Sequence, residues 1–313
     1  MLREPLARYC SDVIGVMLSG SHLNAVSEGP ALRLARSRTA AGITVPVVAS
    51  GDRWFSLSPL TTEIEPETLS AASLAQIRAA IDTGQLPQAE TPARYAPPLA
   101  RIGKIVCIGL NYSDHAAETG ATPPAEPVVF MKAPDTVVGS GDDVLIPRRS
   151  VKTDYEVELA IVLGAAARYL DSPDDARACV AGFAISNDVS EREFQAERGG
   201  QWDKGKNCET FNPFGPWIVT ADEAGDPQDL ALRLWVNGQL RQDGGTKNMI
   251  FGVDYLVWYL SQFMTLYPGD VINTGTPAGV ALGRPDKPYL RDGDVVELEI
   301  DGLGRQRQTF RAA

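Results

Sequence analysis

The sequence is poor in the residues that build disulfide scaffolds, thiolate metal sites and membrane helices. Its 313 residues include four cysteines, with no CxxC pair, and two histidines. This cysteine spacing gives no sign of a disulfide framework or a zinc site. No run reaches the roughly 18 apolar residues of a membrane-spanning helix, and residues 1–30 do not resemble a secretion signal. We therefore expect a cytoplasmic protein with reduced thiols and no membrane partner.

Positive charge is also in deficit, since 29 Lys and Arg stand against 40 Asp and Glu and leave a net charge of −11. This balance argues against nucleic acid and anionic membrane surfaces as partners. Hydrophobic residues make up 44% of the chain and charged residues 22%, which is typical of a globular protein rather than a disordered one. The composition suits an enzyme with a small-molecule substrate.

The chain divides into three predicted segments: an extension (1–30), a small amino-terminal domain with a linker (31–98) and a larger domain (99–313). In the small domain, Gly51-Asp52 predicts a hairpin turn and Pro66–Ile81 has helical spacing of apolar residues. The proline-rich stretch that follows, residues 83–99, is typical of a linker.

Strand patterns dominate the larger domain, and its best helical pattern is Val253–Met264. The predicted strands are Ile105–Leu110, Val128–Met131, Val144–Ile146, Tyr155–Leu163, Val180–Ser186, Trp217–Val219, Leu232–Val236, Asp270–Thr274 and Val295–Ile300. Many short strands with few helices predict a β-rich, mixed α/β fold rather than a doubly wound sheet.

Two glutamates alternate along the predicted strand 155–163. Because side chains alternate between the faces of a strand, Glu156 and Glu158 share one face, about 7 Å apart at Cα. Their oxygens can converge on one cation, and a solvated strand face is the alternative. Glu297 and Glu299 show the same alternation, and we interpret that pair as a surface strand.

Asp188 follows the apolar run that ends the predicted strand 180–186. Together with Glu156 and Glu158 it makes a carboxylate-only set, which selects a hard divalent cation, Mg²⁺ or Mn²⁺. A helix N-cap is an equally plausible role for Asp188 on its own.

His115 is the only histidine of the larger domain, because the other one, His22, lies in the extension. It is therefore the only imidazole there that can act as a base near neutral pH. Glu118 follows at i+3, where one helical turn brings it beside the ring. A surface helix that begins with Asp114 as its cap remains the alternative.

Residues 200–207, GQWDKGKN, nearly spell a phosphate-binding P-loop, but Asn207 replaces its hydroxyl residue and no strand–helix frame surrounds it. We interpret this stretch as a lid-like loop that brings Lys206 to an anionic substrate. Residues 273–280 form a predicted turn of small residues, whose amides and Thr276 hydroxyl are suited to a carboxylate; a simple turn is the alternative.

These segments together resemble the fumarylacetoacetate hydrolase family over about 104–301. The stretches that carry the resemblance are IGLNYSDHAAE, PVVFMKAPDTVVGSGDDVLIP, DYEVELAIVLG, SNDVSEREFQ, GQWDKGKNCETFNPFGPW and PGDVINTGTPAGV. The resemblance implies a catalytic domain with a rolled mixed β-sheet, a small amino-terminal domain and a homodimer. It is strongest to bacterial-type members that act on acylpyruvates or sugar-derived 2,4-diketo acids, and to ureidoglycolate lyases.

The resemblance also implies a role for each candidate residue. Glu156, Glu158 and Asp188 match the metal ligands, His115 and Glu118 match the catalytic dyad, Lys206 and Gln195 match the pair that contacts the substrate and its oxyanion, and Thr276 matches the carboxylate-binding threonine. Asn111 stands where the eukaryotic fumarylacetoacetases have an aspartate ligand, which makes fumarylacetoacetate a poor candidate substrate.

The expected activity is metal-dependent hydrolysis of a C–C bond in a small anionic 2,4-diketo acid, to give pyruvate and a carboxylic acid. The same enolate chemistry leaves open an isomerase, tautomerase, decarboxylase or ureidoglycolate-type lyase that acts on a related 2-oxo acid. A member that binds a metabolite without catalysis is the remaining alternative.

Overall fold

The computed structural model describes residues 32–120 and 122–313, so the predicted extension 1–30 lies outside the described residues. The strands are β1 (Leu32–Arg38), β2 (Thr44–Ser50), β3 (Arg53–Ser56), β4 (Gln88–Ala89), β5 (Tyr95–Ala96), β6 (Ile105–Gly109), β7 (Val128–Lys132), β8 (Val137–Val138), β9 (Val144–Ile146), β10 (Thr153–Asp154), β11 (Val157–Leu163), β12 (Val180–Asn187), β13 (Ser190–Glu191), β14 (Asn212–Thr220), β15 (Ala231–Val236), β16 (Gln239–Gly245), β17 (Val271–Asn273), β18 (Val295–Ile300) and β19 (Gly304–Ala312). The α-helices are α1 (Ala71–Asp82), α2 (Ser113–Thr119), α3 (Asp203–Lys206) and α4 (Val253–Ser261). Single helical turns are η1 (Pro66–Leu69), η2 (Pro134–Thr136), η3 (Pro173–Asp175), η4 (Arg177–Cys179), η5 (Glu193–Glu197), η6 (Thr246–Asn248) and η7 (Ala281–Gly283).

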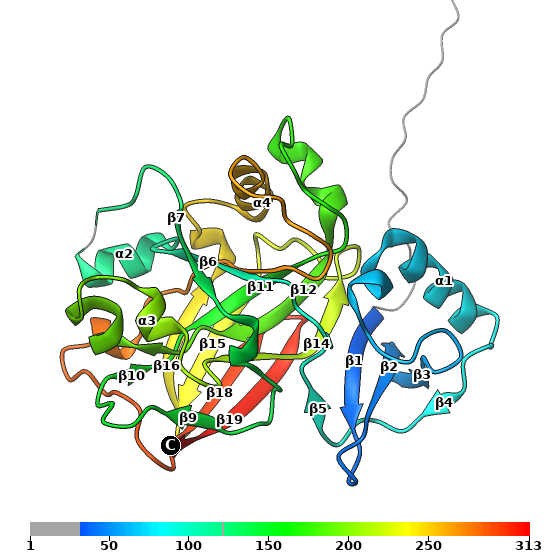
Figure 1. The fold of residues 1–313 in the computed structure, drawn as a ribbon, viewed down its shortest axis with the longest axis horizontal. Helices are drawn as coiled ribbons and strands as arrows, with labels where there is room; N and C mark the ends of the chain where they lie inside the picture. Colours follow the sequence, from blue (N-terminus) through cyan, green and yellow to red (C-terminus); the bar gives the residue numbers. More distant parts are fainter. Residues whose placement is uncertain (1–31, 121) are drawn as a thin grey trace, which may run out of the picture.

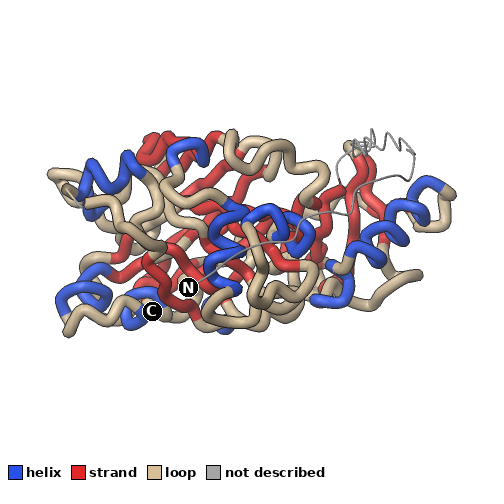
Figure 2. Tube along the Cα trace, turned by 90° about the horizontal axis from the view of Figure 1, so that it is seen from above, coloured by secondary structure: helices blue, strands red, loops and turns tan. Residues whose placement is uncertain are grey.

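Two large sheets organise these elements. The first runs in the order β4-β3-β2-β1-β14-β12-β11-β17-β6-β7, with β5 paired to β1 and β8 paired to β14; the second runs in the order β16-β15-β18-β19-β9. Both are mixed, because β17 pairs with β6 and β19 pairs with β9 in parallel, whereas most other pairs are antiparallel. Helices lie outside the strands (Figures 1 and 2). The prediction of a β-rich, mixed α/β fold is confirmed.

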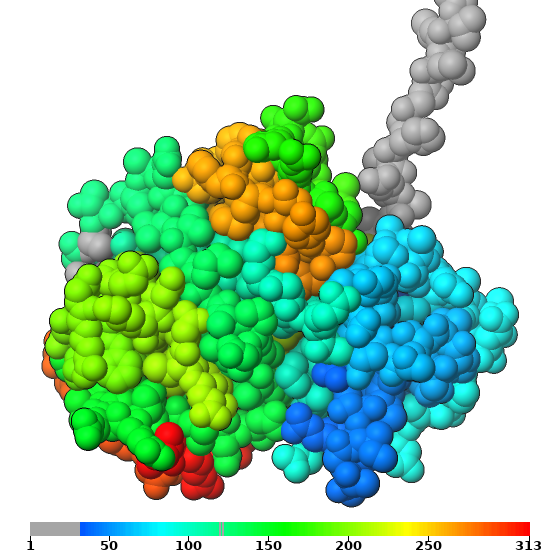
Figure 3. Space-filling view, in the orientation of Figure 1, coloured from blue at the N-terminus to red at the C-terminus, as the bar shows by residue number. Residues whose placement is uncertain are grey.

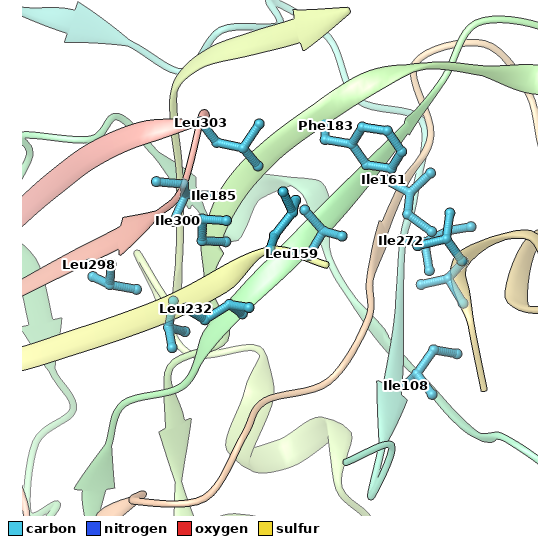
Figure 4. Packing of buried hydrophobic residues seen from close by; sticks show 14 of the residues in the cluster. Ile108, Leu159, Ile161, Phe183, Ile185, Leu232, Ile272, Leu298, Ile300 and Leu303 are labelled. Atoms are coloured by element: carbon cyan, nitrogen blue, oxygen red, sulfur yellow. The ribbon is translucent and has the colours of Figure 1, made fainter. Parts of the chain in front are cut away.

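The main core lies between the two sheets. Leu159, Ile161, Phe183 and Ile185 come from the first sheet and meet Leu232, Leu298, Ile300 and Leu303 of the second sheet and its turn (Figure 4). The other face of β11 and β12 packs into a second apolar cluster with residues of the amino-terminal part. Because β11 is covered on both faces, any carboxylate that it carries at its start is buried.

The amino-terminal strands extend the first sheet, since β1 pairs with β14 at Arg33–Val219 and Leu34–Ile218. This part forms the blue and cyan region beside the larger body in Figure 3. The predicted hairpin is present as β2 and β3. The region Pro66–Ile81, predicted as one helix, consists of two, η1 and α1. They are separated by Ser70, whose backbone is extended with a ψ of 148°. The Ser70 hydroxyl caps α1 by accepting the N–H of Ser73.

Every predicted strand of the larger domain is present; Val144–Ile146 and Val295–Ile300 have the predicted ends, and the ends of the others are shifted. The strand predicted over Tyr155–Leu163 begins at Val157, because the N–H of Glu156 donates to Asn187 Oδ1 instead. The polar strands β16 and β19 were not predicted. Among the described residues, Cys107, Cys179 and Cys208 are free thiols, and no helix is long and apolar enough to cross a membrane.

Candidate active site and metal centre

A pocket of about 240 Å³ opens at the start of β11 and the end of β12. Seven of the eight predicted site residues line it: His115, Glu156, Glu158, Asp188, Gln195, Lys206 and Thr276. The eighth, Glu118, lies beside His115. Residues that are up to about 160 positions apart in the chain therefore lie around one pocket.

The three predicted metal ligands form one buried cluster. One oxygen from each of Glu156, Glu158 and Asp188 can be chosen so that all three lie within 4.8 Å of one another. The three residues are 5%, 2% and 0% exposed, so the alternative of a solvated strand face is wrong. The N-cap alternative for Asp188 is also wrong, because the residue stands between β12 and β13, where no helix begins.

Buried cations neutralise much of this cluster. Lys206 Nζ lies 2.8 Å from Glu156 Oε2 and 2.7 Å from Asp188 Oδ2, while Arg192 Nη2 lies 2.6 Å from Glu156 Oε1. Burial by itself raises the pKa of Glu156, but Lys206 and Arg192 outweigh it and lower the pKa to about 2. Lys132 Nζ lies 2.6 Å from the second oxygen, Oδ1, of Asp188.

Among the described residues, no cation forms an ion pair with Glu158. Its Oε2 accepts the N–H of Gly275 at 2.9 Å. Burial, followed by the charges of Asp188 and Glu156, raises its pKa well above the usual range. Gly275 makes this contact with a φ of 96°, and a Cβ there would lie 2.9 Å from the Cβ of Asn111. An all-oxygen donor set with one uncompensated carboxylate fits a divalent cation such as Mg²⁺ or Mn²⁺.

Asn111 is not part of this cluster. Its Nδ2 donates to the carbonyl oxygens of Phe251 and Thr274, and its Oδ1 accepts the N–H of Phe251. The amide therefore ties together three chain segments beneath the pocket. Both polar ends of the Asn111 side chain are therefore engaged with backbone groups, which accounts for an amide at this position.

His115 and Glu118 lie on one face of α2, with Nδ1 of the imidazole 3.5 Å from Oε2 of the carboxylate. His115 is 8% exposed, so the alternative of a surface helix start is wrong at this residue. Both carboxylate oxygens of Glu118 accept the N–H of Gly279 at 3.0 Å. Burial raises the pKa of Glu118, but the contacts with His115 and Gly279 outweigh it and lower the pKa below its usual value.

The remaining predicted residues are more enclosed than expected. Lys206 ends the short helix α3 and is 2% exposed, so the prediction of a lid-like loop is wrong for this residue. Gln195 Oε1 accepts from Arg192 Nη1 at 3.0 Å. The Thr276 hydroxyl donates to the carbonyl of Val157 and accepts from Gln242 Nε2, so its hydrogen bonds are made within the protein.

The unpredicted residues of the site include Lys132, Asp154, Arg192 and Trp202. All four stand within the stretches that carry the family resemblance. Asp154 accepts from Arg192 Nε and from the N–H groups of Ala281 and Leu282. Lys132 directly follows the apolar run 128–131. Because a lysine is seldom buried without a partner, its position at the end of this run could have indicated a buried ion pair.

Comparisons with known proteins show which family the chain resembles. Residues 104–311 match the family model described as fumarylacetoacetate (FAA) hydrolase, C-terminal. A Burkholderia multivorans protein named only as a hydrolase is 51% identical over 270 residues, which cover 85% of this chain and 94% of that protein. The structure of 2-hydroxyhepta-2,4-diene-1,7-dioate isomerase from Mycobacterium marinum is 32% identical with a TM-score of 0.65, covering 90% of this chain and 98% of that one. The structure of maleylpyruvate hydrolase from Sphingobium sp. SYK-6 is 28% identical with a TM-score of 0.73, covering 90% of this chain and all of that one.

Proposed function

The chain belongs to the fumarylacetoacetate hydrolase family, and we propose that it is a metal-dependent hydrolase that cleaves a C–C bond in a 2,4-diketo acid. The products are pyruvate and a carboxylic acid. The observation that carries the proposal is the meeting of the His115–Glu118 pair with the buried carboxylates Glu156, Glu158 and Asp188 in one pocket. Maleylpyruvate, named for one structural relative, is itself a 2,4-diketo acid.

In this proposal Glu156, Glu158 and Asp188 hold Mg²⁺ or Mn²⁺. The bound cation supplies Lewis-acid chemistry to the carboxylate and 2-oxo groups of the substrate. The three side chains are held in place beforehand, Glu156 and Asp188 by their buried lysine and arginine partners and Glu158 by the Gly275 N–H. Such preorganisation is what makes a charged site effective.

His115 acts as the general base. It takes a proton from water, and the water oxygen bonds to the C4 carbonyl carbon of the substrate. Glu118 orients the imidazole and stabilises its protonated form. The C3–C4 bond then breaks and its electron pair remains on C3 as the pyruvate enolate. The proton taken up by His115 is returned to C3, which completes pyruvate and restores the base. Lys206 and Gln195 face the pocket, where they stabilise the oxyanion that develops at C4.

Isomerisation of a related 2-oxo acid is the second candidate function, and the likeness to the Mycobacterium marinum isomerase favours it. The two reactions share an enolate and differ in whether water adds to carbon. The test incubates the purified protein with acylpyruvates and Mg²⁺ and identifies the products. Pyruvate plus a carboxylic acid supports hydrolysis. A product isomeric with the substrate, or release of CO₂, rejects it.

We also propose that the enzyme works as a cytoplasmic homodimer on a small anionic 2-oxo acid, as the family resemblance implies. Size-exclusion chromatography with light scattering measures the mass directly, and a value near the 33.6 kDa of one chain rejects the dimer.

A further inference from the structure

Within the function proposed above, on which this inference rests, we infer that the acyl group of the substrate is apolar and uncharged. The pocket lining combines two chemically different sets of side chains. The triad and its cations form the charged set. The apolar set consists of Ile108, Leu110, Phe130, Ala196, Trp202 and Leu282. In this inference, a 2,4-diketo acid whose carboxylate end is held by the charged set presents its acyl group to the apolar set.

The apolar set forms one packed surface, called the wall below. The rings of Phe130 and Trp202 meet edge to face, with centroids 5.5 Å apart. Trp202 packs directly over Gly109, where any side chain would overlap the indole. The N–H of Leu282, another residue of the apolar set, is fixed to Asp154, which also binds Arg192. The wall therefore has a fixed shape that buries aliphatic groups at a gain of about fourfold in binding per methylene.

A second carboxylate on the substrate finds no free cation among the lining residues. Arg192 is already bound to Asp154, Glu156 and Gln195. Lys206 is shared between Glu156 and Asp188, and the remaining basic group, His115, lies against Glu118. A carboxylate at the acyl end would therefore lie against apolar side chains without an ion-pair partner, which disfavours it relative to an alkyl group.

Hydroxyl groups on the acyl chain are disfavoured for the same reason. Two polar oxygens of the lining are already engaged inside the protein, since the Thr276 hydroxyl binds Val157 and Gln242 and the Gln195 oxygen binds Arg192. This separates the chain from maleylpyruvate hydrolase and from the dioate isomerase, whose substrates carry a second carboxylate. It also disfavours the sugar-derived diketo acids that the sequence resemblance left open.

The test compares four substrates in the presence of Mg²⁺. 2,4-Dioxoheptanoate, 2,4-dioxoheptanedioate and 7-hydroxy-2,4-dioxoheptanoate share one backbone and differ only at the last carbon. 2,4-Dioxopentanoate lacks two methylenes. We expect kcat/KM for the heptanoate to exceed that for the pentanoate about 15-fold and that for the dioate at least about tenfold. Equal or better cleavage of the dioate or the hydroxy acid overturns the inference and leaves the proposed function standing. Absence of pyruvate from all four substrates overturns the function itself.

A substitution at Leu282 tests whether the acyl group of the substrate lies against the wall. Leu282 is 38% exposed, so Leu282→Arg adds a cation beside the acyl end without opening the core. We expect the kcat/KM ratio of dioate to heptanoate to rise at least about tenfold. Leu240→Arg is the matched control, because Leu240 is 49% exposed on β16 and does not line the pocket. An unchanged ratio in Leu282→Arg, or an equal rise in both variants, shows that the acyl group does not lie against this wall.

Discussion

Lys132 and Lys206 bind the two oxygens of the same carboxylate, that of Asp188, at 2.6 and 2.7 Å. Both ammonium groups are buried, and they reach Asp188 from different elements, the end of β7 and the end of α3. Lys206 also binds Glu156, whereas Lys132 has no second carboxylate and donates instead to the carbonyl of Val189. The two lysines therefore differ in role: Lys206 lines the pocket, and Lys132 supports Asp188 from behind.

Removal of Lys132 should destabilise the fold. Lys132→Met leaves Asp188 with one ammonium in a fully buried position, and breaking one partner of a buried ion pair costs about 3–5 kcal/mol. Urea denaturation measures the free energy of unfolding. Lys152→Met is the control, because the Lys152–Glu197 pair lies at the surface, and we expect little change there. Equal stability of wild type and Lys132→Met contradicts the assignment of Lys132 as the support of Asp188.

Glu158 should be required for metal binding. Glu158→Gln removes one donor charge from the triad, and we expect the Mg²⁺ dissociation constant to rise more than about 100-fold, with loss of activity. Calorimetric titration measures the binding. Glu299→Gln is the matched control, since Glu299 occupies a similar alternating strand but pairs with Arg233 at the surface. Full activity of Glu158→Gln, or of wild type in excess chelator, removes the metal from the mechanism.

The His115–Glu118 pair should be required for turnover and not for metal binding. We expect His115→Asn and Glu118→Gln to lower kcat about 10²–10⁴-fold while the Mg²⁺ affinity stays nearly constant. Pyruvate release from an acylpyruvate gives kcat, and titration gives the affinity. If His115→Asn hydrolyses the substrate at the wild-type rate, another group activates the water.

The stability that Glu118 contributes should depend on pH in one direction. Its pKa is lowered in the folded protein from the usual 4.5, so folding favours the ionised form. The contribution is therefore complete above pH 4.5 and disappears as the pH falls through the lowered value. The difference in unfolding free energy between wild type and Glu118→Gln, measured from pH 7 to pH 3, should stay constant and then shrink. A difference that grows toward low pH has the wrong sign for this assignment.

The near P-loop should bind no nucleotide. Its lysine, Lys206, points into the carboxylate cluster, and the helix that follows the glycines has only four residues. We expect no saturable ATP or GTP binding at up to millimolar concentration, measured by fluorescence or calorimetric titration without substrate. Micromolar affinity that disappears in Lys206→Ala contradicts both this prediction and the proposed role of the lysine.

The predictable part of the fold followed local apolar patterns. The strands at 105–109, 157–163 and 180–187 are buried on both faces, and their continuous apolar runs predicted them. Strands β16 and β19, with the sequences QLRQDGG and GRQRQTFRA, have no such pattern. These strands form because their backbone groups pair with neighbouring strands; β19, for example, pairs with β18 on one side and β9 on the other. Sequence alone does not contain that pairing.

Site residues were predictable where two residues with a characteristic chemical role lie a few positions apart in the sequence. Glu156 with Glu158, and His115 with Glu118, are of that kind. Arg192 and Lys132 were not predicted, because their partners Asp154 and Asp188 lie 38 and 56 positions away in the chain. The enclosed position of Lys206 was missed for a related reason, since a glycine-rich stretch is also typical of a mobile loop.

The short helix α3 has a kinetic consequence. It starts directly after Trp202 and ends at Lys206, so one helical turn joins the apolar wall to the ammonium that bridges Glu156 and Asp188. Phe130 contacts both ends, with its ring beside Trp202 and 5.0 Å from Lys206 Nζ. In the proposed mechanism, in which Lys206 stabilises the transition state, a substrate that fills the wall would also contact the residues that position this ammonium. The length of the acyl chain should consequently change kcat as well as KM, as expected when binding energy far from the reacting bond is used for catalysis.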